Sequence, residues 1–425
     1  MYIKYNMTII DKLMQYLFHC SAASSNGKSP MVMRSVSFLL LLLPALSVSA
    51  NPDIQTWQTD NGAKVLFVPA TEIPMLDIRI VFDAGSARDD GESGLALLTN
   101  GLLAEGAAGR DAQQIAEAFE SVGAQLNYDA ARDMATVGVR SLTESRFLKS
   151  AIAGLTMVLT QPDFPEEAFQ RELNRMKVAV KARQQSPSAI ASEAFDAAVF
   201  GDHPYARPVS GDAESLEQIT LDDVRGFYKK YYVARNATIA IVGNVNRKQA
   251  EELVSTVVST LPAGEKPAEI PPVKPMTESK NIVIEYPSAQ SHIFVGQPGM
   301  RRGDPDYFAL YLANHSFGGS GFASRLVEVI REENGLAYSV YSYFSPLRQN
   351  GAFTMGMQTK FEQTEKALSL LESELKKYVS EGPGDEELAA SVSNVTGGFP
   401  LKIDSNGKLL GYLMMIGFYD LPLDY

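Results

Sequence analysis

The chain carries one pattern of strands, loops and helices twice, and this long-period repeat limits the folds that it can adopt. Gly123 ends a helical stretch in the first copy, and Gly335 stands 212 residues later after a similar stretch. A Pro-rich, acidic phrase at residues 162–168 returns at residues 383–388, with the second Glu of each pair offset by 220 residues. Because 425 residues are too many for one typical domain, the repeat predicts two homologous lobes.

Each copy mixes strand-like and helix-like runs. Residues 166–185 show the apolar stripe of a long helix, and residues 237–243 form the continuous apolar run of a buried strand. Residues 125–129 and 134–139 alternate as strands do. The predicted fold class is therefore α+β, with two lobes that each pack helices on a mixed sheet.

Composition sets the expected lobe boundaries. Residues 51–261 form the first lobe, and residues 262–277, dense in Pro, Glu and Lys, are predicted to be an exposed linker. Residues 278–425 form the second lobe. The repeat offset places the counterpart of strand 237–243 near residue 460, so we expect the second lobe to be incomplete at its C-terminus, by truncation or as a naturally shorter lobe.

The N-terminal 50 residues are predicted to be absent from the mature protein. A basic start at residues 33–37, an apolar run at 38–46 and small residues ending at Ala50 are typical of a secretory signal cleaved after Ala50. The apolar run is too short to span a bilayer, so no transmembrane segment is expected after signal removal. Residues 1–32 precede the expected natural start.

Charge and cysteine content then exclude several classes of function. The single cysteine, Cys20, lies in the segment expected to be removed, so the mature chain has no thiol for a disulfide, a metal or a nucleophile. Residues 1–50 carry four basic residues and one acid, so their removal changes the net charge from −12 to −15. This acidic balance argues against nucleic acid as a partner. We expect an exported, periplasmic protein.

A helical phrase at residues 94–103 resembles the opening of the insulinase/pitrilysin-type metallopeptidases, the inverzincins. In that family H-x-x-E-H places two zinc ligands and a general base on one helix face. Here Leu97, Asn100 and Gly101 occupy those three positions. An alkyl chain and a glycine offer no side-chain lone pair, and an amide is not a base at neutral pH. The resemblance therefore implies a degenerate zinc motif.

The remaining candidate ligands do not restore a metal site. The family's third ligand would fall near residues 178–179, where this chain has Val and Ala, and Glu172 upstream is at most a retained second acid. His203, His292 and His315 have no partner three or four residues away, so each is expected to be a structural hydrogen-bonding residue. We predict that this chain binds no metal or other cofactor.

A second phrase of the same family is intact. Residues 324–326 and 331–340 resemble the segment that brings an arginine and a tyrosine, here Arg331 and Tyr338, to the substrate. The resemblance implies that both side chains contact a peptide carbonyl held on zinc. The alternative is a surface arginine paired with Glu332 beside a half-buried tyrosine. Gly318, Gly319 and Gly321 form a glycine loop that, in this family, closes over the cavity between the lobes.

The resemblance covers nearly all of the expected mature chain and implies a clamshell of two lobes. It also implies a function: a subunit that is inactive alone, pairs with a zinc-bearing homologous subunit, and supplies Arg331 and Tyr338 for metalloendopeptidase activity on peptides. A non-catalytic protein of the same fold that binds peptides or supports assembly is the alternative.

Overall fold

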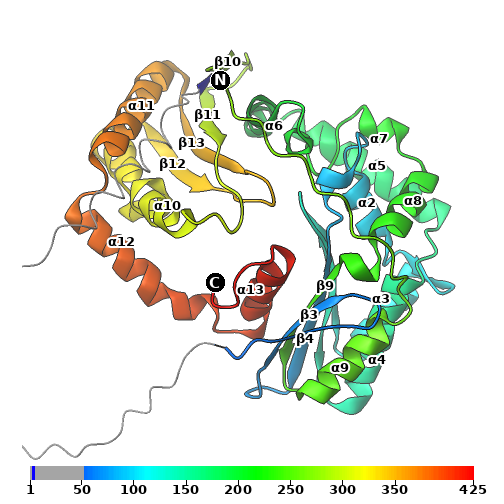
Figure 1. Cartoon of the computed structure of the whole chain (residues 1–425). Helices are drawn as coiled ribbons and strands as arrows, with labels where there is room; N and C mark the ends of the chain where they lie inside the picture. The colour runs from blue at the N-terminus through cyan, green and yellow to red at the C-terminus, as the bar shows by residue number, and fades with distance from the viewer. Residues whose placement is uncertain (1, 5–51) are drawn as a thin grey trace, which may run out of the picture.

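The computed structural model describes residues 2–4 and 52–425, which fold into two large sheets with helices on both faces (Figure 1). The predicted signal at residues 33–50, its cleavage point after Ala50 and Cys20 lie outside the described residues. Within the described part, no helix has both the length and the apolar character needed to cross a membrane. The predicted fold class, two α+β lobes, is confirmed.

The first sheet has the strand order β2-β3-β9-β4-β8-β7. It is mixed, because β9 runs parallel to β3 and antiparallel to β4. Every residue of β9 is buried, as the continuous apolar run predicts. The strands are β2 (Gln55–Gln58), β3 (Lys64–Pro69), β4 (Met75–Phe82), β7 (Gln125–Ala130), β8 (Ala135–Leu142) and β9 (Ala237–Gly243).

The second sheet has the order β10-β1-β11-β13-β12. Its long strands β11, β13 and β12 are antiparallel neighbours, so β12 is an edge strand. A separate two-stranded sheet, β5 (Gly106–Ala107) and β6 (Arg110–Asp111), follows α2 in the first lobe. The second sheet comprises β1 (Tyr2–Lys4), β10 (Ile282–Val283), β11 (Gln290–Pro298), β12 (Ala337–Phe344) and β13 (Ala352–Lys360).

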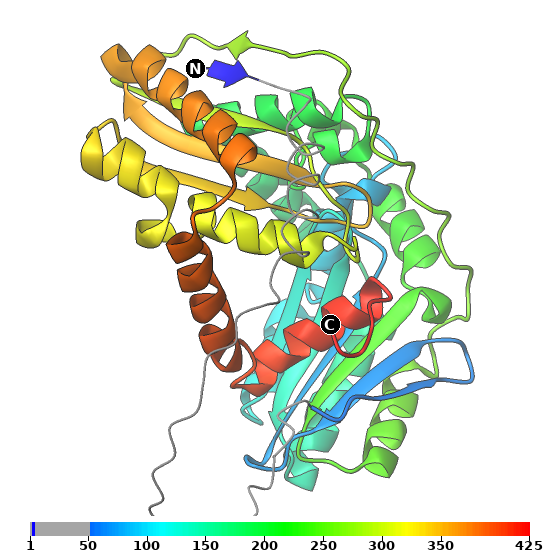
Figure 2. The same ribbon diagram turned by 60° about the vertical axis from the view of Figure 1, so that its left-hand side comes forward.

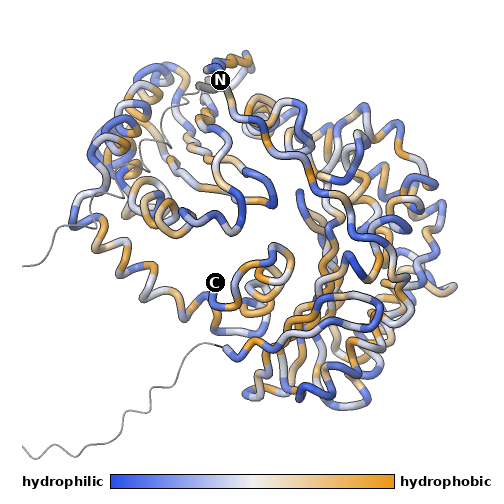
Figure 3. Tube along the Cα trace, in the orientation of Figure 1, coloured by the Kyte–Doolittle hydropathy of each residue, from blue (hydrophilic) through white to orange (hydrophobic). Residues whose placement is uncertain are grey.

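Helices cover the outer face of each sheet, as Figures 1 and 2 show. In Figure 3 hydrophobic residues concentrate in the strands of the first lobe, where helices lie on either side. The helices of the first half are α2 (Leu95–Leu102), α3 (Ala112–Glu120), α4 (Ser145–Thr160), α5 (Glu166–Arg183), α6 (Pro187–Phe200), α7 (Ser215–Gln218), α8 (Leu221–Tyr231) and α9 (Arg247–Val258). Those of the second half are α10 (Tyr307–Asn314), the π-helices His315–Gly319 and Val327–Glu333, α11 (Thr364–Glu381), α12 (Asp385–Gly398) and α13 (Asn406–Phe418).

The two halves exchange helices across the molecule. From the second half, α13 packs on the inner face of the first sheet, where Leu413 and Ile416 join a core with Leu66. Gly417 makes this approach possible, because a Cβ there would lie 2.5 Å from Leu66 Cδ1. From the first half, α6 packs on β11, where the Phe195 and Phe294 rings lie 5.9 Å apart. Each sheet therefore depends on the other half of the chain for its second cover.

A buried polar junction fixes the lobes where these covers meet. Asp133, 1% exposed in the β7–β8 loop, accepts hydrogen bonds from the Tyr205 hydroxyl (2.5 Å) and the Tyr419 hydroxyl (2.9 Å). The backbone N–H of Arg348, in the β12–β13 loop of the second lobe, donates to the same carboxylate at 2.7 Å. Burial, together with the nearby Asp133 charge, raises the pKa of both phenols, so they remain donors.

The predicted linker differs in part from the expected exposed segment. Residues 262–277 contain no helix or strand, in keeping with their Pro content. Ile270 and Val273 are nevertheless buried in the cluster that α6 forms with the second sheet. Proline and charge dominate the composition of this stretch, so its two isolated apolar side chains did not indicate a buried segment.

The helix exchange predicts that α13 stabilises the first lobe. Leu413→Ala, at a fully buried position, should lower the free energy of unfolding by about 2–5 kcal/mol, since a cavity would open against β3 and β9. Leu401→Ala, at a position 67% exposed, is the matched control and should change it by less than about 0.5 kcal/mol. Urea unfolding measures both, and equal losses would contradict the exchange.

Candidate functional site

The three degenerate motif positions lie together on α2. Leu97 is partly buried and packs against the core of the first lobe, while a Cβ added at Gly101 would meet no atom within 4 Å. Asn100 is 1% exposed, and its Nδ2 donates to the backbone oxygens of Asp129 (3.0 Å) and Thr136 (3.3 Å). Asn100 therefore ties α2 to the β7–β8 hairpin, a packing role that replaces acid–base chemistry.

Glu172 lies on α5, which packs against α2. Its carboxylate is only 11% exposed and is paired with two cations: Arg175 Nη2 lies 2.5 Å away, and Arg171 Nε lies 3.8 Å away. Arg171 also pairs with Glu105, which extends the cluster. Because these ion pairs already compensate the carboxylate, Glu172 acts here as part of a structural charge cluster.

The donor set of this region does not fit zinc. Catalytic zinc needs three protein ligands, whereas Leu97 and Gly101 bring no side-chain donor. Val178, where the third ligand would stand, is 69% exposed. Across residues 2–4 and 52–425, no three His, Cys, Asp or Glu side chains gather closely enough to hold a metal ion.

A buried carboxylate holds the start of α2. Asp89, 4% exposed, accepts hydrogen bonds from the backbone N–H groups of Gly94 and Ala96, each at 2.8 Å. Gly94 has a left-handed conformation (φ 101°), which lets the chain turn into the helix. Burial raises the pKa of Asp89 to about 8, although the two N–H donors act in the opposite direction.

Arg331 and Tyr338 lie side by side on the second lobe. Arg331 stands near the end of the π-helix Val327–Glu333, and Tyr338 lies near the start of β12. The pairing of β12 with β13 shifts between Ala337 and Ser339, so Tyr338 is the extra residue of a β-bulge. The Arg331 guanidinium carbon lies 5.0 Å from the centre of the Tyr338 ring.

The alternative interpretation of Arg331, a surface arginine paired with Glu332, is met in part. Arg331 Nε lies 3.3 Å from the Glu332 carboxylate, but that carboxylate is 61% exposed and the ion pair is weak. Tyr338 is 83% exposed, not half-buried. Packing in the core of the second lobe therefore does not explain why a tyrosine stands at position 338.

The glycine loop leads directly to this pair. Gly318 and Gly319 end the π-helix His315–Gly319, and Gly321 starts a short 3-10 helix, Gly321–Ala323. Sequence reasoning missed Phe322 in that helix: it is 78% exposed, and its ring centre lies 4.9 Å from the Arg331 guanidinium carbon. An aromatic residue inside a glycine-rich loop was the available signal.

The site residues thus form two separate groups. Leu97, Asn100, Gly101 and Glu172 belong to the outer helices of the first lobe, whereas Arg331, Tyr338 and the glycine loop belong to the second lobe (Figure 1). The two groups therefore belong to different lobes and do not form a single site.

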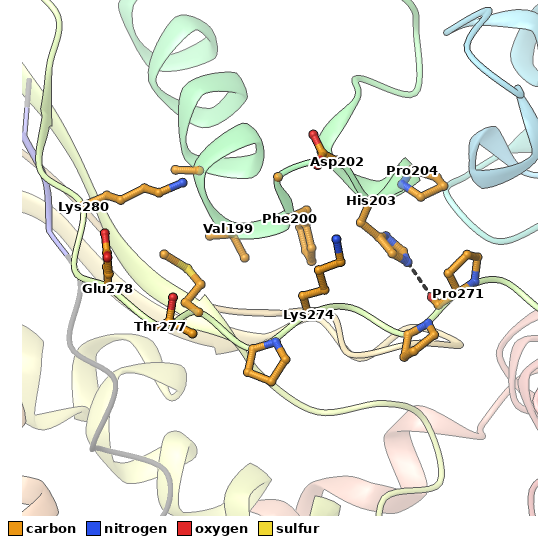
Figure 4. A pocket seen from close by; sticks show the side chains of 15 residues that line it. Val199, Phe200, Asp202, His203, Pro204, Pro271, Lys274, Thr277, Glu278 and Lys280 are labelled. Atoms are coloured by element: carbon orange, nitrogen blue, oxygen red, sulfur yellow. Dashed lines mark hydrogen bonds between the residues drawn. The ribbon is translucent and has the colours of Figure 1, made fainter.

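Two of the described histidines, His203 and His315, have structural partners. His203 Nδ1 accepts from the backbone N–H of Tyr205 at 3.1 Å, and Nε2 lies 2.8 Å from the Pro271 oxygen. A cavity of about 400 Å³ lies beside it, where Lys274 and Lys280 face the end of α6 (Figure 4). Both His203 nitrogens are occupied, so the ring is not available to a ligand there. His315 contacts Ser391 (3.0 Å) and Asn394 (3.2 Å) of α12.

Asp89 predicts a pH dependence of stability. Its folded-state pKa lies above its ordinary value, so the protonated Asp89 carboxyl stabilises the folded state relative to the unfolded chain. This contribution to the free energy of unfolding is complete below about pH 4 and is lost as the pH rises toward 8. Urea unfolding between pH 5 and 8 should show a decline of up to about 1.4 kcal/mol per pH unit that Asp89→Asn removes. Asp111→Asn, at an exposed helix N-cap, is the control; a slope that persists in Asp89→Asn would refute the assignment.

Asn100 predicts a structural cost. Asn100→Ala removes two hydrogen bonds to backbone oxygens, of which the one to Thr136 is buried, and should lower the free energy of unfolding by about 1–3 kcal/mol. Asn127→Ala, which removes only an exposed local hydrogen bond, should change it by less than about 0.5 kcal/mol. Chemical denaturation of the two variants tests the difference.

Comparison with known proteins matches this chain to one peptidase family. The family described as "Insulinase (Peptidase family M16)" matches residues 65–213, and "Peptidase M16 inactive domain" matches residues 218–395. The Helicobacter pylori protein named "Non-peptidase homolog YmxG" is 26% identical over 91% of this chain and 90% of its own. The Bacillus subtilis "Uncharacterized zinc protease YmxG" is 24% identical over 84% of this chain and 86% of its own.

A solved structure matches most of the chain. The crystal structure of a peptidase M16 inactive domain from Pseudomonas fluorescens has a TM-score of 0.84 and 38% identity, covering 88% of this chain and 89% of that one. The degenerate motif on α2 lies within the stretch that the insulinase model matches, whereas the inactive-domain model matches the second half of the chain. On these grounds the chain belongs to the insulinase family of peptidases, family M16.

Proposed function

We propose that this chain is the zinc-free subunit of a two-part peptidase, in which it pairs with a zinc-bearing homologue and supplies Arg331 and Tyr338. The observation that carries the proposal is the exposure of Tyr338, which is 83% exposed at a β-bulge and lies against the half-buried Arg331 guanidinium. Bulges recur beside active sites because they re-aim a side chain. The degenerate α2 supports the division of labour, since the described residues gather no three side chains that could hold a metal ion for the pair to serve.

The chemistry of the pair suits stabilisation of a transition state. As a nucleophile attacks a peptide carbonyl, negative charge develops on its oxygen, and donors already aimed at that position lower the barrier. The Arg331 guanidinium offers several N–H groups in one plane, and the Tyr338 hydroxyl offers one O–H. The zinc of the partner would supply the activated water. The residues of this chain would bind and orient the peptide.

We further propose export to the periplasm, on the strength of the signal-like pattern at residues 33–50 and the acidic charge. The tagged chain should be recovered from the periplasmic fraction with an N-terminus at Asn51. A zinc-bearing homologue should co-purify with it. Recovery from the cytoplasm with residues 33–50 attached would refute export.

The name "Non-peptidase homolog" borne by the H. pylori relative favours one alternative, a non-catalytic protein that binds peptides or supports assembly. Under that proposal the purified chain binds peptides, and no zinc-bearing homologue accompanies it. The same purification, followed by zinc analysis and a peptide-cleavage assay, separates the two functions.

Arg331 predicts a kinetic effect in the complex. Arg331→Ala should lower kcat by about 100-fold with a small change in KM, because its hydrogen bonds strengthen as charge develops on the carbonyl oxygen. Arg301→Ala, which removes an exposed arginine of the same lobe, is the matched control and should keep the activity. Peptidase activity with stoichiometric zinc from this chain alone would overturn the division of labour.

A further inference from the structure

Three side chains of the second lobe form a surface cluster that core packing does not explain. Phe322 and Tyr338 are 78% and 83% exposed, and no other large hydrophobic side chain of the described residues is as exposed as these two. Both rings lie against one guanidinium: the Arg331 carbon is 4.9 Å from the Phe322 ring centre and 5.0 Å from that of Tyr338. Distances of this size are those of cation–π contacts.

The glycine loop builds this cluster. Gly318 packs tightly on β12, since a Cβ there would lie 2.4 Å from Ser342 Oγ and 2.7 Å from its backbone nitrogen. Asn314 strengthens the contact: its Nδ2 donates to the Ser342 oxygen at 3.0 Å, and its Oδ1 accepts from Ser342 Oγ at 2.6 Å. The base of the loop is therefore fixed to the strand that carries Tyr338.

Beyond this fixed base, the loop turns at Gly321. Its φ of 63° is left-handed, and a Cβ there would meet no atom within 4 Å. Backbone conformation, not lack of space, thus calls for glycine at this position. The turn leads at once into Phe322, whose ring then reaches Arg331 on the following helix.

We propose that Phe322 is a positioning residue for Arg331, an inference that rests on the proposed function. A free arginine side chain samples many rotamers, and ordering it when the substrate arrives opposes binding and catalysis. Rings that contact the guanidinium restrict it beforehand. They leave its N–H edge for the carbonyl oxygen of a peptide held by the partner.

The surroundings of Arg331 agree with this role. Within the described residues its one ion pair is with the exposed Glu332 carboxylate, at Nε. Because the Glu332 side chain is 61% exposed, this pair holds the guanidinium only loosely. The two rings are therefore the contacts best placed to order the guanidinium.

The first test reads the side chain itself in the full chain without any partner. The ¹⁵Nε–H resonance of Arg331, assigned with Arg331→Lys, should show a ring-current shift. Phe322→Ala should remove part of that shift and speed hydrogen exchange at Nε, and Phe322→Tyr should restore both. Phe361→Ala, which removes another exposed ring of the second lobe (65%), is the control and should leave the resonance unchanged. An unchanged resonance in Phe322→Ala would overturn the proposal.

The second test reads kinetics in the complex with the zinc-bearing homologue. Phe322→Ala should lower kcat about two- to fivefold with little change in KM, Phe322→Tyr should restore it, and Phe361→Ala should have no effect. If Arg331→Ala lowers kcat while Phe322→Ala does not, the positioning role is wrong and the proposed function stands. If neither lowers kcat, the proposed function fails and the positioning role fails with it.

Discussion

The exchange of helices between the halves is the constraint on which the rest of this structure depends. The helix that each sheet takes from the other half buries apolar side chains of the strands, and without it these side chains would face water. The first sheet receives α13 from the second half, and the second sheet receives α6 from the first half. Neither half can therefore bury its own sheet completely, and the lobes fold as mutually dependent units.

The hydrogen bonds of Asp133 connect the two lobes at a buried point. A buried carboxylate without partners would be costly, but Asp133 accepts from two phenols and one backbone N–H drawn from both halves. Close by, Arg88 holds Asp83 through two hydrogen bonds of 2.8 and 2.6 Å, and Arg348 Nε lies 3.7 Å from the same carboxylate. Separation of the lobes would expose several of these groups at once, so the junction holds the two lobes together.

The sequence predicted regular elements well where one period dominated. The apolar run 237–243 is β9 to the residue, and the helix expected at 166–185 ends at Arg183. Contacts between residues distant in the chain could not be predicted in this way, because nothing in the spacing of Asp133, Tyr205 and Tyr419 indicates that they meet. Phe322 was not predicted because the exposure of a single loop residue cannot be inferred from the sequence. Likewise, the short motif pointed to Asn100 but could not predict its hydrogen bonds to two strands.

The degenerate zinc-motif positions and the Arg331–Tyr338 pair contribute differently to the stability of this chain. The first-lobe positions serve stability: Asn100 on α2 donates hydrogen bonds to the β7–β8 hairpin, and Glu172 on α5 is paired with two arginines. The second-lobe cluster serves stability poorly, because a bulge interrupts strand pairing and two exposed rings gain little from burial. A feature that costs stability and persists in an otherwise well-packed lobe calls for a use outside the lobe. A peptide bound at a shared site would supply that use, since its carbonyl would meet a guanidinium already held in place.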